Sequence, residues 1–167
     1  MSNDLSHAAS VPPSSSQGAR PASHEDLAAL LELISGDEKH SSASTSTLDI
    51  LWVLYDWVLR VRPEAVDDPD RDRFILSKGH GPAAYYAVLA AKGFIAAELL
   101  RDWASFDSPL GHHPDRLLIP GVEISSGSLG HGLPIAVGVA LGLRIQRRQL
   151  PRVVCLVGAF LAPTACR

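Results

Sequence analysis

The sequence predicts an α/β fold in which helices pack on a parallel sheet. Residues 73–77 and 153–157 contain short continuous apolar runs, which are typical of parallel strands buried on both faces. Several other segments place apolar residues three and four positions apart, which is the spacing of one helix face. The predicted order of helices, strand, helices, Gly-rich turn, helix and strand indicates a layered α/β domain.

Composition and length limit the class of protein. The chain has 167 residues, of which 46% are hydrophobic and 20% charged, so one globular domain is expected. A net charge of -3 and a pI near 6.1 predict no nucleic-acid partner and no anionic membrane partner. The most apolar segment, residues 48–61, is interrupted by three charged side chains, and the N-terminus lacks a secretory signal pattern. We therefore expect a cytoplasmic protein.

The two cysteines, Cys155 and Cys166, do not form a disulfide framework. Cys155 lies inside an apolar run and is expected to be a small side chain of the hydrophobic core. A reducing compartment agrees with this cysteine usage.

The first half of the chain is expected to contain a tail, two helices and a strand. Residues 1–23 are rich in Ser, Ala and Pro, which predicts a disordered tail. A helix follows from about Glu25 to Ile34. A second helix from Ser46 to Val61 is apolar around most of its surface, so it is expected to be buried on most sides.

The second half is expected to contain two helices, a loop, a long helix and a second strand, at residues 83–91, 96–106, 107–122, 134–149 and 153–157. Pro82 suits the first turn of its helix and Gly93 its C-terminal cap. Gly138 and Gly142 would let a neighbour pack closely against the long helix. The final strand is expected in the centre of a parallel sheet.

Five of the seven histidines lie between positions 40 and 131, in or beside predicted loops. Any one of them alone could be a solvent-exposed side chain without a function. His80 and His131, however, are flanked by glycines and precede helix starts, where free backbone N–H groups favour a diphosphate. A zinc site is disfavoured, because the sequence has neither a Cys-x-x-Cys motif nor a His pair four residues apart.

Four blocks of the sequence, in order, resemble the N-terminal part of transketolase: KHSSASTSTLDILWVLY, DRFILSKGHGPAAYYAVLAAKGF, GHHPDRLLIPGVE and SSGSLGHGLPIAVGVALGLR. The sequences of these blocks are most similar to the split form of the family, in which this region is a separate N-terminal subunit. The resemblance implies that the α/β fold is an incomplete thiamine diphosphate-binding module.

The resemblance also implies roles for individual residues. His40 and His113 would contact the sugar substrate as catalytic residues. Cofactor contacts are implied for five residues, which are Lys78, His80, Gly127, Leu129 and His131. One departure concerns His40, which follows Lys39 where relatives commonly have Gly.

A second departure concerns the metal. In the family a strand like residues 153–157 leads into Gly-Asp-Gly and a later Asn, whose oxygens bind Mg2+. Here Ala159 and Phe160 follow Gly158, so no residue of this sequence is assigned to a metal. Accordingly, residues 24–158 are interpreted as a partial transketolase-type domain and residues 159–167 as a tail that does not resemble the family. Our hypothesis for the origin of that tail is a frameshift or premature stop.

The resemblance implies transfer of a two-carbon ketol unit between sugar phosphates, with thiamine diphosphate and Mg2+ as cofactors. The chain would act as an N-terminal subunit in an oligomer with a C-terminal, pyrimidine-binding subunit, and would be inactive alone. One alternative is a truncated, non-catalytic remnant or interaction module. Another is a fragment like deoxyxylulose-phosphate synthase, although the SKGH and PGVE motifs fit transketolase better.

Overall fold

The computed structural model describes residues 22–34, 46–79 and 82–158. His40, His80, residues 159–167 and all but the last two residues of the predicted N-terminal tail lie outside this part of the chain. The described elements are α1 (Asp26–Leu33), α3 (Leu48–Val53), the π-helix η2 (Leu54–Val58), the 3-10 helix η3 (Pro63–Ala65), β1 (Arg73–Leu76), α4 (Ala83–Ala91), the 3-10 helix η4 (Ala97–Asp102), α5 (Gly132–Ile145) and β2 (Val153–Leu156).

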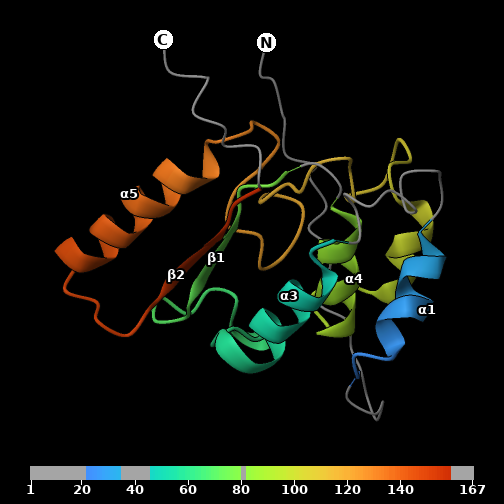
Figure 1. Ribbon diagram of the computed structural model, residues 1–167, viewed down its shortest axis with the longest axis horizontal. Helices are drawn as coiled ribbons and strands as arrows, with labels where there is room; N and C mark the ends of the chain where they lie inside the picture. The colour runs from blue at the N-terminus through green and yellow to red at the C-terminus, as the bar shows by residue number, and fades with distance from the viewer. Residues whose placement is uncertain (1–21, 35–45, 80–81, 159–167) are drawn as a thin grey trace, which may run out of the picture.

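The two strands form a parallel pair between two helical layers (Figure 1). Phe74 pairs with Val154 and Ile75 with Cys155 in the register of the sheet. Helix α5 covers one face, whereas α4, with α1 and α3 packed on it, lies on the other side (Figure 1). The predicted α/β fold with helices on a parallel sheet is therefore confirmed.

The hydrophobic core lies between β1 and the layer formed by α1, α3 and α4. Every residue of α4 from Ala83 to Leu89 is buried, and its alanines allow neighbours to approach closely. Phe74 of β1 contacts Tyr55 and Tyr85, with ring centroids 5.6 and 5.5 Å apart. The two tyrosine hydroxyls lie 3.0 Å apart and satisfy each other, and burial raises the pKa of both.

Asp72 fixes the amino end of the sheet. Its side chain is fully buried and accepts hydrogen bonds from the backbone N–H groups of Arg60 at 2.9 Å and Arg152 at 2.8 Å. The guanidinium groups of the same two arginines add bonds of 3.0, 3.1 and 2.6 Å. Burial would raise the pKa of Asp72, but the bonds from Arg152 and Arg60 outweigh it and hold the pKa well below its usual range. Asp72 thus joins the segment after η2 to the beginning of β2.

The helix predicted for residues 46–61 is shorter and more exposed than expected. Its α-helical part ends at Val53, and a π-helix continues to Val58. Ile50 and Val53 are half exposed, and Trp57 is 83% exposed. The expectation of burial on most sides was wrong, because apolar periodicity does not tell how many neighbouring elements pack on a helix.

Two other helices also differ from expectation. The segment predicted as a helix at residues 96–106 is a 3-10 helix that ends at Asp102, and Ala104 then adopts a positive φ of 58°. The Ala104 N–H donates to the carbonyl of Leu110 at 2.8 Å, so the chain turns back there instead of continuing as a helix. Helix α5 starts two residues before Pro134 and ends at Ile145 rather than near Gln149.

The second strand is less buried than a central strand would be. All four residues of β2, including Cys155, are only partly buried, so the expectation that Cys155 belongs to the core was wrong. In the described part of the chain, β1 is the one strand that pairs with β2. Among the same residues, a Cβ atom at Gly138 or Gly142 would meet nothing within 4 Å. No described helix is long and apolar enough to cross a membrane.

Candidate functional site

The candidate site lies at the carboxyl end of β1, where the Gly-rich loop enters α5. Open α/β sheets bind ligands at the carboxyl ends of their strands. Ser77 directly follows β1, and Gly132 begins α5. A Cβ atom at Gly132 would lie 2.4 Å from Cβ of Ser77. Glycine at position 132 is therefore what lets the helix start against the end of the strand.

Three segments meet at this edge through glycines. The Nδ1 atom of His113 lies 3.1 Å from the carbonyl oxygen of Gly79. A Cβ atom at Gly79 would lie 2.4 Å from the backbone N of Gly127, and one at Gly127 would lie 3.1 Å from Cγ of His113. If Nδ1 carries the proton and donates to Gly79, Nε2 of His113 is left as a hydrogen-bond acceptor.

The loop that carries Gly127 is held by hydrogen bonds to the segment after His113. The Ser126 N–H donates to the carbonyl of Pro114 at 3.1 Å. The Ser125 hydroxyl donates to Oδ1 of Asp115 at 3.1 Å and accepts from the Arg116 N–H at 3.2 Å. The GHHP and SSGS segments, which are separated in the sequence, are thus neighbours in the fold.

A small cavity of about 80 Å³ lies between the strand end, this loop and the start of α5. Its lining includes Ser77, Ser126, Ser128, His131 and Gly132. The Oγ atom of Ser126 is buried and has no hydrogen-bond partner in the described part of the chain. No described side chain caps the N-terminus of α5 either. The cavity therefore offers hydrogen-bond donors that the fold itself does not use.

Lys78 adds a positive charge at the same edge. It follows Ser77, and its Nζ lies 3.5 Å from Oγ of Ser46. A Cβ atom at Gly158, two residues after β2, would lie 3.5 Å from Cγ of Lys78. Burial lowers the pKa of the Lys78 ammonium group.

The structure brings four of the predicted site residues to one edge: Lys78, His113, Gly127 and His131. Leu129 lies in the same loop with its side chain 54% exposed. His40 and His80 fall outside the described residues. Ser126 belongs to the SSGSLG block, but nothing in that block singled it out, because serine is common in loops and only the burial of its Oγ atom makes it unusual.

The described residues contain no group of three or more His, Cys, Asp or Glu side chains that could hold a metal ion. The corresponding family ligands would fall on positions 159 and beyond, which lie outside the described part of the chain.

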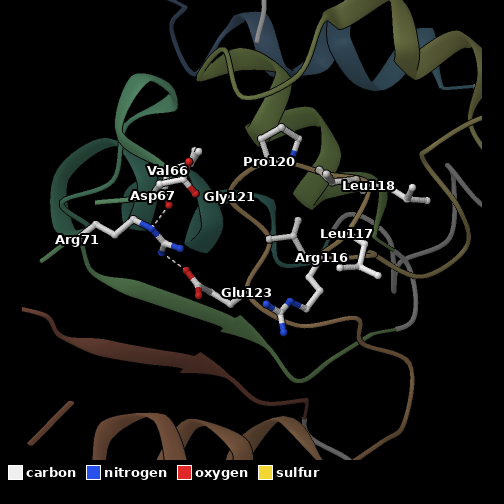
Figure 2. A pocket seen from close by; sticks show the side chains of 11 residues that line it. Val66, Asp67, Arg71, Arg116, Leu117, Leu118, Pro120, Gly121 and Glu123 are labelled. Carbon is white, nitrogen blue, oxygen red and sulfur yellow. Dashed lines mark hydrogen bonds and ion pairs between the residues drawn. The ribbon is translucent and has the colours of Figure 1, made fainter. Parts of the chain in front are cut away.

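A larger pocket of about 320 Å³ lies at the opposite, amino end of β1 (Figure 2). Arg71 donates there to the carboxylate of Glu123 and to the carbonyl of Val66. Arg116 and Asp67 lie on the walls of the same pocket. Arg71 and Glu123 neutralise each other in this pocket.

The fold and this edge define an α/β domain of the class that binds a phosphorylated ligand at the carboxyl ends of parallel strands. Comparison with known families gives a specific match. The family model described as "Transketolase, thiamine diphosphate binding domain" matches residues 29–152. The chain therefore belongs to the transketolase family, as its motifs predicted.

The relatives share much of this chain but are longer. A Rhodococcoides fascians protein named ferredoxin fas2 is 65% identical over 136 residues, which are 81% of this chain and 45% of that protein. An apulose-4-phosphate transketolase subunit from Actinobacillus succinogenes is 44% identical over 63% of this chain and 38% of its own length. The chain thus spans less than half the length of these curated relatives.

Solved structures agree on the fold. Transketolase from Leishmania mexicana aligns with a TM-score of 0.62 and 26% identity, over 84% of this chain and 23% of that one. Transketolase from Campylobacter jejuni aligns with the same TM-score and 24% identity, over 81% of this chain and 23% of the other. Both alignments support an α/β fragment of a thiamine diphosphate-binding fold.

Proposed function

We propose that the chain acts as the N-terminal, cofactor-binding part of a transketolase-type enzyme that transfers a two-carbon ketol unit between sugar phosphates. The observation that carries the proposal is the contact between Gly79, His113 and Gly127 at the carboxyl end of β1. Family membership and the relatives named as subunits of split transketolases support it.

The described residues fit part of a thiamine diphosphate site. Gly79 and Gly127 bring the SKGH turn and the Gly-rich loop into direct backbone contact at this edge, and Ser126 Oγ is a buried polar atom without a partner in the described chain. When bound, the cofactor supplies a thiazolium carbon that stabilises the two-carbon carbanion. The protein's task is to hold and orient the reactants.

His113 is our proposed contact to the sugar. The bond between its Nδ1 and the Gly79 carbonyl fixes the ring at the carboxyl end of β1, where we propose that it contacts a hydroxyl group of the donor sugar. Lys78 and His131 supply cationic or hydrogen-bonding groups for a phosphorylated ligand. Leu129 provides apolar surface for the cofactor rings, and for His40 and His80 the roles implied by the motifs remain predictions.

Mg2+ does not fit the described residues, because they lack a cluster of three possible ligands. No step of the proposed reaction is therefore assigned to a metal held by these residues. Loading with Mg2+ would need ligands from outside the described residues or from a partner chain.

A separate pyrimidine-binding subunit is the proposed partner. Three relatives carry transketolase subunit names, namely two apulose-4-phosphate transketolase subunits and a 6-deoxy-6-sulfo-D-fructose transketolase subunit of a Clostridium species. Those names support an assembly with a second kind of subunit, and the two apulose-4-phosphate names support a sugar phosphate substrate. A cytoplasmic setting remains a prediction from the sequence.

A non-catalytic interaction module is the second candidate function. Helix α5 exposes a row of apolar side chains, and β2 is only partly buried, so both could bind another chain. This sequence has two cysteines, fewer than the four that hold an iron–sulfur cluster, so these residues do not by themselves supply such a site.

Isothermal calorimetry, in which thiamine diphosphate is titrated into the protein in the presence of Mg2+, distinguishes the catalytic proposal from the interaction module. The chain is titrated alone and mixed with a pyrimidine-binding transketolase subunit from a related split enzyme. Micromolar binding supports the cofactor-binding part of the proposal. Loss of ketol transfer by the mixture with His113→Ala, but not with the neighbouring His112→Ala, supports the proposed contact to the sugar. If thiamine diphosphate fails to bind even in the mixture, the interaction module is the better account.

A further inference from the structure

Two buried aromatic side chains donate to one backbone carbonyl close to the candidate site. The hydroxyl of Tyr86 in α4 donates to the carbonyl oxygen of Gly111 at 2.9 Å, and Nε1 of Trp103 donates to the same oxygen at 3.2 Å. Tyr86 is fully buried and Trp103 is 5% exposed. Because a carbonyl oxygen has two lone pairs, this acceptor is fully used, and its position is fixed from α4 and from the end of η4.

The fixed carbonyl lies two residues before His113, our proposed contact to the sugar. The Nδ1 atom of His113 lies 3.1 Å from the carbonyl oxygen of Gly79, and the next residue, Pro114, accepts from the Ser126 N–H at 3.1 Å. The short segment from Gly111 to Pro114 is therefore held at its start by the buried helical layer and at its end by the loops of the site.

The need of buried polar groups for an acceptor explains these bonds only in part. Any buried hydroxyl or indole N–H requires a partner. The neighbouring Tyr85 hydroxyl meets this need inside the core, 3.0 Å from the Tyr55 hydroxyl. Tyr86 and Trp103 instead both reach Gly111, in the loop that leads to the site. Burial raises the pKa of Tyr86, so its hydroxyl stays protonated and remains a donor at neutral pH.

We propose that Tyr86 and Trp103 are positioning residues, which orient the His113 ring through the Gly111 carbonyl. Loss of a donor lets the segment shift and moves the ring away from Gly127, which it contacts at the site. A displacement of about 1 Å matters for a group that must meet a substrate in a fixed geometry. The consequence for the sugar rests on the proposed function, whereas the placement of the ring can be measured in the chain alone.

Tyr85→Phe is the matched control for Tyr86→Phe, because each removes one buried hydroxyl from adjacent positions of α4. Tyr85→Phe leaves the Tyr55 hydroxyl without its partner, whereas Tyr86→Phe leaves the Gly111 carbonyl with a second donor. We therefore expect Tm to fall by about 2–8 °C in Tyr85→Phe and by less in Tyr86→Phe. The effects on His113 should follow the opposite order, which a purely structural role of both tyrosines does not predict.

NMR of the full chain measures where the ring lies. The signal is the nuclear Overhauser cross-peak between the ring protons of His113 and the α protons of Gly127, whose backbone lies against the ring. His113→Ala identifies this cross-peak by its disappearance. We expect full intensity in Tyr85→Phe, a large loss in Tyr86→Phe, and a loss in Trp103→Phe, which removes the other donor. Full intensity in Tyr86→Phe, or an equal loss in Tyr85→Phe, would overturn the positioning role.

Kinetics of the mixture with a pyrimidine-binding subunit test the consequence for the sugar, with apulose 4-phosphate as the donor probe, after the names of two relatives. Tyr86→Phe should raise KM about threefold to tenfold with a smaller change in kcat, whereas Tyr85→Phe should change neither by more than about twofold. If the cross-peak responds as expected but the unmodified mixture shows no transfer, or KM does not change, the positioning role stands and the proposed contact of His113 with the sugar is wrong.

Discussion

Asp72 allows the sharpest test of what holds the sheet together. Its fully buried carboxylate accepts five hydrogen bonds from Arg60 and Arg152, at 2.6–3.1 Å. Asp72→Asn keeps the shape but removes the charge and turns one acceptor into a donor that faces N–H groups. Breaking a fully buried ion pair costs about 3–5 kcal/mol, but both guanidinium groups are half exposed and can turn to water. We therefore expect a loss of about 2–3 kcal/mol in the free energy of unfolding.

The pH dependence of this loss has a defined sign. The folded-state pKa of Asp72 lies below its value of about 3.9 in the unfolded chain. Its contribution to stability is therefore complete above the unfolded pKa and is lost as pH falls through the folded pKa. The difference in stability between the unmodified chain and Asp72→Asn should shrink steadily from about pH 5 to pH 2.

Urea unfolding at pH 7 and at lower pH measures both effects. Asp70→Asn is the matched control, because Asp70 pairs with Arg148 at 2.6 Å on the surface, where such pairs contribute about 0–1 kcal/mol. If Asp72→Asn loses no more stability than Asp70→Asn, or if its deficit is independent of pH, the role assigned to the buried carboxylate is wrong.

Three further substitutions test local features. Gly127→Ala puts a Cβ atom 3.1 Å from the His113 ring at a φ of +141°, so we expect a loss of about 1–3 kcal/mol in urea unfolding and weaker thiamine diphosphate binding; unchanged stability would contradict the tight contact. Gly138→Ala meets open space on α5 and should instead stabilise by about 0.5–1 kcal/mol, unless that face is covered. Tyr55→Phe leaves the buried Tyr85 hydroxyl without its partner and should destabilise by about 1–3 kcal/mol in the same assay, whereas a neutral result would mean that water replaces the lost bond.

Local chemistry explains which elements could be predicted from the sequence. Helix α4 spans residues 83–91 as expected, because Pro82 and Gly93 set its ends through backbone constraints that act within a few residues. Both strands were predicted correctly because short continuous apolar runs are typical of buried parallel strands. The helix at residues 97–102 was predicted to be too long. The hydrogen bond between Ala104 and Leu110, which turns the chain after it, joins residues that show no periodic pattern in the sequence.

Burial could not be predicted in the same way, because it depends on neighbours that are distant in the sequence. The apolar residues of η2 look alike in the sequence, yet Tyr55 is buried against Phe74 while Trp57 is 83% exposed. At the candidate site, motifs indicated His113 and Gly127, but their contact through Gly79 follows only from the folding of three separate loops. Ser126 and Asp72 lie in blocks that resemble the family, but nothing in those blocks indicated that the Ser126 hydroxyl is buried or that Asp72 binds two arginines.

The two ends of β1 differ in whether their polar groups already have partners. We therefore expect substitutions at one end to change stability and substitutions at the other end to change ligand affinity. At the amino end, charged side chains satisfy one another, as in the contacts of Asp72 and the Arg71–Glu123 pair. At the carboxyl end, glycines bring backbone segments together, and within the described residues the Ser126 hydroxyl has no partner and no side chain caps the start of α5. Substitutions at Asp72 should therefore lower stability without changing the affinity of the folded protein for thiamine diphosphate. Removing the Ser126 hydroxyl should instead cost little stability and weaken thiamine diphosphate binding, since a binding site keeps polar groups unsatisfied until its ligand arrives.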